Sequence, residues 1–167
     1  MADLTIRPAS PDPRTLVRLR VPLADAPRAA AAMDLPNTPL RWSGSDPSAL
    51  WIGPDEWLLV SDSRSAEEMV ARCQDLLRDV LHAATDLSDA LACILLEGSN
   101  AHQLLAMGSG IDFDSSVFTP GQCVRTRIAK LAVVIRAIDR EQFEMFLDRS
   151  VSRYFLEYLG RNARDIG

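Results

Sequence analysis

The order of apolar segments along the chain repeats once, and this repetition limits the possible folds more than any other feature of the sequence. The first copy runs from about residue 15 to 81 and the second from about residue 91 to 159. In each copy the periodicity predicts a strand, a helix, a hairpin and a second helix, in that order. We therefore predict an α+β fold of two diverged β-α-β-β-α units, with antiparallel sheets covered by helices.

The first copy carries local signals for its elements. Residues 15–21 alternate apolar side chains with arginine, as a half-exposed strand does, and residues 25–33 are alanine-rich with a proline in the first turn of a predicted helix. The turn formers of residues 53–56 separate the two strands of a predicted hairpin. Ser65 and Glu68 have the spacing of a capping box, which predicts the start of the next helix.

The second copy follows a predicted strand at 83–87 and begins with another strand at 91–97. A short helix at 100–108, a loop and a hairpin at 123–137 come next. Asp139 is placed to cap a last helix. We assign to this helix a stripe of seven apolar residues: Phe143, Phe146, Leu147, Val151, Tyr154, Phe155 and Tyr158.

The first 13 residues differ in composition from the rest of the chain. Residues 1–13 contain prolines at positions 8, 11 and 13 and few large apolar groups, so we expect a flexible N-terminal tail. We expect residues 14–167 to form a single compact globular unit made of the two pseudo-repeats, at about 15–81 and 91–159.

Composition excludes several classes of protein. The net charge is −5, with acidic and basic residues interspersed, which argues against binding to nucleic acid. The longest apolar runs, 90–96 and 131–135, are far shorter than the roughly 20 residues of a membrane helix, so we expect no membrane partner. The N-terminus lacks the apolar stretch of an exported precursor, and the three cysteines are widely spaced, so we expect a cytoplasmic protein with reduced thiols.

Several motifs in the middle of the chain occur together in one known family. They are Trp51-Ile52-Gly53-Pro54-Asp55-Glu56-Trp57-Leu58-Leu59, then Thr85-Asp86-Leu87-Ser88-Asp89-Ala90, then Leu95-Leu96-Glu97-Gly98 with Asn100-Ala101, then Phe118 with Gly121, Cys123 and Thr126. This series resembles gamma subunits of heterotetrameric sarcosine oxidase. Asp86-Leu87-Ser88, followed by an apolar strand, a glycine turn and a short helix, is also similar to the aminomethyltransferase folate-binding fold.

The resemblance implies a function in a larger complex. That complex oxidises sarcosine through flavin, makes hydrogen peroxide and passes a one-carbon unit to tetrahydrofolate. FAD, FMN, NAD, tetrahydrofolate and zinc are then expected in partner subunits and none in this chain. The implied role is a non-catalytic structural subunit that contacts the other sarcosine oxidase subunits, chiefly the large alpha subunit. The alternative is a free-standing folate-binding protein or one-carbon transferase.

The residues themselves predict no catalytic, cofactor-binding or metal-binding site. The chain lacks a G-x-G-x-x-G motif and a Walker loop. His82 and His102 are the only imidazoles, and neither has a second histidine or a cysteine at helical spacing. Cys93 and Cys123 are interpreted as buried thiols, with a redox role for Cys123 as the alternative.

Four aspartates, at positions 86, 89, 112 and 114, are the carboxylates that most resemble acids, bases or folate ligands. Their ordinary role is to hold turns, which aspartate favours because its side chain bonds to nearby backbone N–H groups. We keep both interpretations open, with turns as the preferred one.

Five residues are candidates for contact with a partner. Trp42, Trp51 and Trp57 are clustered, and tryptophan is enriched where proteins dock, but we expect at least one of them to lie in the core. Arg125 and Arg127 alternate with apolar residues on the second hairpin, where they are either solvated or part of a charged interface.

Overall fold

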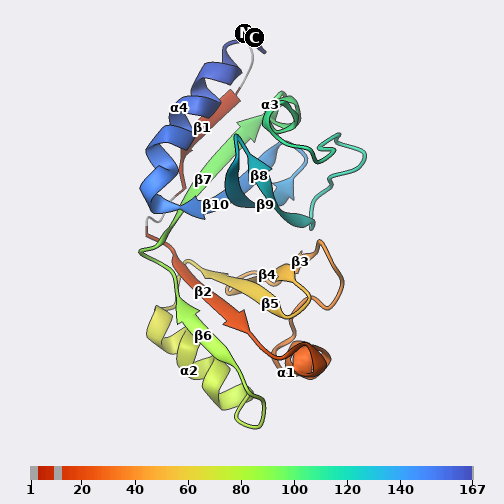
Figure 1. The fold of residues 1–167 in the computed structure, drawn as a ribbon, viewed down its shortest axis with the longest axis vertical. Helices are drawn as coiled ribbons and strands as arrows, with labels where there is room; N and C mark the ends of the chain where they lie inside the picture. The colour runs from red at the N-terminus through yellow and green to blue at the C-terminus, as the bar shows by residue number, and fades with distance from the viewer. Residues whose placement is uncertain (1–3, 10–12, 167) are drawn as a thin grey trace. The chain divides into compact units, whose positions relative to one another are not determined.

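The described part of the chain forms two compact units rather than the single unit predicted from the sequence. The computed structural model describes residues 4–9 and 13–166. Unit 1 combines Met1–Asp12 with Ala90–Gly167, and unit 2 contains Pro13–Asp89 (Figure 1). Each unit has its own sheet, helices and apolar core, and these features define it as a distinct unit.

Unit 2 is an antiparallel sheet with helices packed against one face. In its described residues the strand order is β3-β4-β5-β2-β6. The strands are β2 (Thr15–Arg20), β3 (Trp42–Ser43), β4 (Ser48–Gly53), β5 (Glu56–Ser61) and β6 (Ala83–Asp86), and the helices are η1 (Leu23–Asp25), α1 (Ala26–Met33) and α2 (Ala66–Leu76). Ala29, Met69 and Cys73 from the helices form one core with Val17 and Leu59 from the sheet.

The helix ends in unit 2 follow from their sequences. The Ser65 hydroxyl accepts a hydrogen bond from the Glu68 amide at 3.2 Å, and the Glu68 carboxylate accepts one from the Ser65 amide at 2.8 Å, which confirms the predicted capping box. Helix α1 ends where Asp34 adopts the left-handed conformation, with φ 56°, a position that aspartate tolerates better than most residues.

Unit 1 repeats this arrangement with the order β1-β7-β10-β9-β8 among the described residues. Its strands are β1 (Leu4–Pro8), β7 (Leu91–Gly98), β8 (Cys123–Ile128), β9 (Leu131–Asp139) and β10 (Gln142–Asp148), and its helices are α3 (Ala101–Gly108), η2 (Arg149–Val151) and α4 (Ser152–Ala163). The core contains Leu104, Phe143, Phe155 and Leu159. A Cβ atom on Gly108 would lie 2.7 Å from the Tyr158 hydroxyl, so glycine lets α3 end close to α4.

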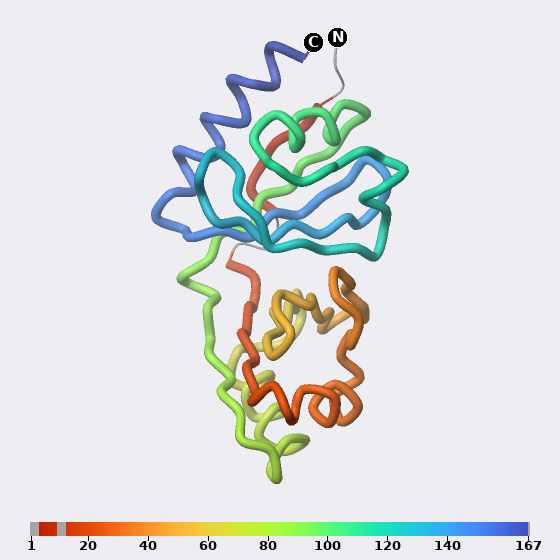
Figure 2. Tube along the Cα trace, turned by 45° about the vertical axis from the view of Figure 1, so that its right-hand side comes forward, coloured from red at the N-terminus to blue at the C-terminus, as the bar shows by residue number. Residues whose placement is uncertain are grey.

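The expectation of a flexible tail over residues 1–13 is wrong for residues 4–8, which form β1. This strand pairs with β7, from Leu4 opposite Gly98 to Pro8 opposite Ile94, and Figure 2 shows the two segments side by side. Proline excludes a helix here but is tolerated in an edge strand, because one side of such a strand makes no ladder bonds. Residues 1–3 and 10–12 of the expected tail lie outside the described residues.

The predicted last helix, from Asp139 to Tyr158, is also wrong in its first half. Residues 142–148 form β10, and α4 begins only at Ser152. Strand β10 is buried on both faces: Phe143, Met145 and Leu147 face the helices, and Phe146 is buried as well. The consecutive apolar residues Met145, Phe146 and Leu147 interrupt the period-two alternation of this strand, so it is easily read as part of a helix.

The two sheets have the same topology when one is read from its opposite end. The order β1-β7-β10-β9-β8 then corresponds to β6-β2-β5-β4-β3. Each copy therefore runs β-α-β-β-β-α, with one more strand than predicted, and the predicted α+β class is confirmed. The edge strands β1 and β6 are exchanged: β1 precedes β2 in sequence but completes the sheet of β7, and β6 precedes β7 but completes the sheet of β2.

One ion pair in unit 1 is buried. Arg136 of β9 lies opposite Glu144 of β10, and its Nε and Nη2 atoms are 2.8 and 2.6 Å from Glu144 Oε2. Each residue is 6% exposed, and the guanidinium lies 5.7 Å from the centre of the Phe146 ring. The guanidinium is thus neutralised and stacked in a place with little water to solvate it.

We expect Glu144→Gln to lower the free energy of unfolding by about 3–5 kcal/mol, because it leaves a buried cation without its counter-charge. Urea denaturation followed by circular dichroism measures the effect. Glu157→Gln is the matched control, since it removes the partner of the exposed Arg153 and Arg161 and should cost at most about 1 kcal/mol. Equal losses in the two variants would contradict the assigned role of the buried pair.

Candidate functional surface

The serine-aspartate pair at positions 86 and 88 builds a turn. The Asp86 Oδ1 atom accepts hydrogen bonds from the amide and hydroxyl of Ser88, at 2.9 and 2.6 Å. The Ser88 hydroxyl oxygen accepts a further bond from the Leu16 amide at 3.1 Å. The preferred interpretation of Asp86 as a turn residue is therefore confirmed.

Two other aspartates repeat this motif. Asp114 accepts from the amide and hydroxyl of Ser116, and Asp148 accepts from those of Ser150. In both cases the serine hydroxyl is the main reason that the pKa of the carboxyl lies below its ordinary value. Asp112 also accepts from the Asp114 amide, at 2.9 Å. These carboxylates hold turns.

The thiols and imidazoles of the described residues are likewise built into the structure. Cys73, Cys93 and Cys123 are buried free cysteines. Burial raises the pKa of Cys73 to about 11, so its thiol stays protonated. His102 of α3 lies with Nδ1 2.5 Å from the Phe113 carbonyl oxygen and Nε2 2.6 Å from that of Arg140, so both ring nitrogens contact backbone.

These groups do not gather into a site. Within residues 4–9 and 13–166 there is no group of three or more His, Cys, Asp or Glu side chains that could hold a metal ion. The same residues contain no helix long and apolar enough to cross a membrane.

The tryptophan cluster divides between core and surface. Trp57 is fully buried in the core of unit 2, where its indole N–H donates to the Pro36 carbonyl at 2.9 Å, so it takes the core position that we expected for at least one of the three. Trp51 lies directly opposite Trp57 on the neighbouring strand and packs against the same core. Trp42 is half-buried on the edge strand β3, opposite Leu50. Trp42 and Trp51 therefore keep accessible parts that a partner can contact.

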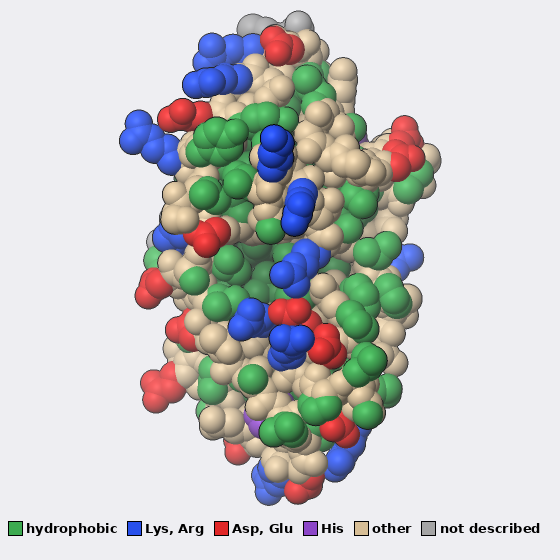
Figure 3. All heavy atoms as spheres, in the orientation of Figure 1, with side chains coloured by type: hydrophobic (Ala, Val, Ile, Leu, Met, Phe, Trp, Pro, Cys, Tyr) green, Lys and Arg blue, Asp and Glu red, His purple; other side chains and the backbone are tan. Residues whose placement is uncertain are grey.

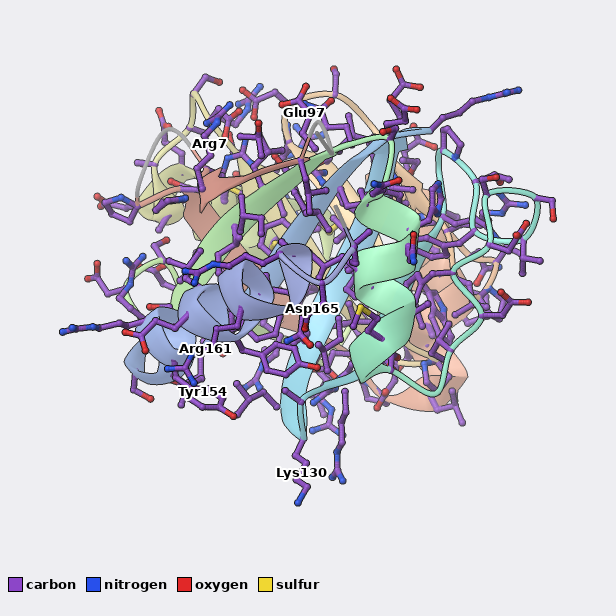
Figure 4. The ribbon with its side chains drawn as sticks, turned by 90° about the horizontal axis from the view of Figure 1, so that it is seen from above. Arg7, Glu97, Lys130, Tyr154, Arg161 and Asp165 are labelled. Carbon is purple, nitrogen blue, oxygen red and sulfur yellow. The ribbon has the colours of Figure 1, made fainter. Side chains whose placement is uncertain are left out.

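The two arginine candidates lie together on β8. Arg125 and Arg127 are exposed, share one face of this edge strand, and line a shallow groove with Gly110, Thr126 and Ala132. Lys130 lies in the turn that follows and extends away from the sheet (Figure 4). We call Arg125, Arg127 and Lys130 the β8 surface. Figure 3 shows Lys and Arg side chains aligned over this strand.

A second exposed surface was missed by the sequence analysis. Tyr154 is 56% exposed, although we had placed it in an apolar stripe with Phe155. It shares the outer face of α4 with Arg153, Glu157 and Arg161, which are paired at i,i+4 spacing (Figure 4). The helical phase of the buried Phe155 and Leu159 is the signal that sets Tyr154 apart. We call Arg153, Tyr154, Glu157 and Arg161 the α4 surface.

Solved structures define the class of protein to which this fold belongs. A chain in the structure of heterotetrameric sarcosine oxidase from Corynebacterium sp. U-96, in complex with pyrrole 2-carboxylate, is similar with a TM-score of 0.81 and 24% identity, over 93% of this chain and 81% of that chain. Aminomethyltransferase T of the glycine cleavage system from Bartonella henselae is similar with a TM-score of 0.66 and 16% identity, over 95% of this chain and 45% of that chain. The chain thus has an aminomethyltransferase-like fold, as predicted.

A family model narrows this class. The model of the sarcosine oxidase gamma subunit family matches residues 21–165, whereas a comparison with curated proteins finds no match. The chain belongs to the sarcosine oxidase gamma subunit family. The match confirms the resemblance seen in the motifs and extends it beyond them toward both ends of the chain.

The burial of the thiols leads to a prediction about their chemistry. We expect the native chain at pH 8 to react only slowly with Ellman's reagent, because a pKa of about 11 leaves about one Cys73 thiol in a thousand ionised and all three thiols are buried. The same protein in concentrated urea is the control and should release the full thiol absorbance at once. A native thiol that reacts as fast as free cysteine would contradict the structural role.

Proposed function

We propose that this chain is a non-catalytic structural subunit of a heterotetrameric sarcosine oxidase complex. In this proposal other subunits carry out the oxidative demethylation of sarcosine, the production of hydrogen peroxide and the one-carbon transfer to tetrahydrofolate. The family match over residues 21–165 is the observation that carries the proposal. The use of Asp86, Asp114 and His102 in turns and backbone contacts supports it, because these groups are then not positioned around a substrate.

The proposal assigns the cofactors to the partners. FAD, FMN, NAD, tetrahydrofolate and zinc are bound by other subunits, and the large alpha subunit is the chief contact of this chain. The three free, buried cysteines are compatible with a reducing cytoplasm as the place where the complex acts.

We further propose that the β8 surface contributes to docking. Arg125 and Arg127 are exposed side by side, and arginine is enriched at interfaces because its guanidinium binds carboxylates in a fixed geometry. A partner that contacts this surface should therefore present acidic side chains. Trp42 and Trp51 are the candidates for apolar contact on unit 2.

Co-expression tests the proposed role. We expect the chain, produced together with the alpha, beta and delta subunits of a sarcosine oxidase operon from the same genome, to elute with them in size-exclusion chromatography, and the isolated chain to be colourless. Titration of the isolated chain with tetrahydrofolate should give no heat. Elution apart from an assembled complex would contradict the proposal, and micromolar folate binding would favour the alternative of a free-standing folate-binding protein.

Charge reversal tests the docking surface. We expect the double variant Arg125→Glu and Arg127→Glu to weaken assembly at least about tenfold, since like charges would then face each other across the interface. Pull-down at several subunit concentrations measures the loss. The matched variant Arg153→Glu and Arg161→Glu changes the same number of charges on the α4 surface and should assemble normally. If only the matched variant fails to assemble, the α4 surface is the one that docks.

A further inference from the structure

A small pocket lies within unit 2, between the end of α1, the side of α2 and the β3–β4 loop. Its volume is about 160 Å³. The lining includes four buried apolar residues, Leu35, Ala49, Leu59 and Met69. A cavity of about 150 Å³ with such walls is large enough to admit benzene. The pocket is therefore of a size to hold an apolar group of a few carbons.

The loop that forms one wall of the pocket is held in place by named contacts. The Asp46 carboxylate accepts hydrogen bonds from the Ser61 hydroxyl and from the Asp62 amide, and the Ser61 bond is the main cause that lowers the pKa of Asp46. Gly44 has φ +84°, and a Cβ atom there would lie 2.8 Å from the Pro47 carbonyl oxygen. The wall is thus fixed by its own sequence before any ligand binds.

Two residues of opposite charge are among those that line the pocket. Asp34 follows α1, whose C-terminal end carries a partial negative charge, so this side favours a cation. Arg72 lies on α2 and supplies a positive charge that favours an anion. Both residues are exposed, whereas Leu59 and Met69 are buried. The lining therefore combines buried apolar residues with one exposed anionic residue and one exposed cationic residue.

We propose that this pocket binds a free α-amino acid with a short apolar side chain. The side chain enters among Leu35, Leu59 and Met69, the ammonium group lies toward Asp34 and the end of α1, and the carboxylate lies toward Arg72. The proposal goes beyond the subunit role and does not depend on it, because every contact comes from unit 2.

L-Leucine is the probe, and the isolated full-length chain is the sample. We expect chemical-shift changes for amides around the pocket in a ¹⁵N-edited NMR titration, with a dissociation constant in the millimolar range. 3-Methylbutylamine lacks the carboxylate and 4-methylpentanoate lacks the amine. Each analogue should bind at least about tenfold more weakly than leucine, because a charge-assisted hydrogen bond is lost. Glycine, which lacks the apolar group, should also bind more weakly than leucine.

Matched variants locate the binding. Arg72→Gln and Asp34→Asn should each weaken leucine binding about tenfold, whereas Arg64→Gln and Asp75→Asn, outside the pocket lining, should leave it unchanged. Asparagine tolerates the left-handed conformation of position 34, so that variant should fold. Ala49→Met should fill the pocket and abolish binding, and the two charge variants keep the test decisive if Ala49→Met does not fold.

Three results would overturn the inference. They are the absence of shifts up to the solubility limit of leucine, equal binding of leucine and glycine, and equal binding by Arg72→Gln and the native chain. If Ala49→Met instead prevents assembly with partner subunits while leucine does not bind, the pocket receives a partner's side chain and the amino-acid proposal is wrong. The proposed subunit role would survive each of these outcomes.

Discussion

The pairing of β1 with β7 adds a strand from the start of the sequence to the sheet formed by its second half, and the organisation of the chain depends on it. Because β1 completes unit 1 and β6 completes unit 2, each sheet takes its edge strand from a segment that precedes the other copy. The two edge strands occupy equivalent positions in sheets of the same topology. A pairing between such distant residues carries a loop-closure cost, which the ladder and the burial of Leu4 and Ile6 against the core must offset.

Sequence reasoning predicted the elements whose signals are local. The capping box at Ser65 and Glu68, the glycine-proline turn of the β4–β5 hairpin and the short helix α3 all depend on neighbouring residues, and all are present. It failed where the pairing strand is distant in sequence, or where the apolar pattern of a segment fits both a strand and a helix. Nothing near Leu4–Pro8 identifies β7 as its partner, and the apolar run Met145–Leu147 interrupts the alternation of β10, so its residues also fit a helix.

The functional residues also divide into those placed by their spacing in the sequence and those whose position depends on tertiary packing. Arg125 and Arg127 could be placed on one face of a strand from their spacing, and the structure puts them on an exposed edge. The core position of Trp57 depends on which side of the sheet the helices cover, which spacing alone does not determine. The pocket was not predictable, because Asp34 and Arg72 come from separate segments that line one pocket only when α1 and α2 pack on the same sheet. Family motifs indicated a subunit, whereas they gave no information about its surfaces.

The discontinuity of unit 1 also orders events during translation. Unit 2 is one continuous stretch, Pro13–Asp89, so all of its residues are synthesised before β7 is made. Strand β1 is synthesised first, yet its partner in the sheet arrives only after the whole of unit 2. Domains fold as units during synthesis, generally from the N-terminus onward. For this chain, β1 must therefore stay unpaired until β7 has been synthesised. Unit 2 is then the first unit able to fold on the ribosome, before unit 1, to which β1 belongs.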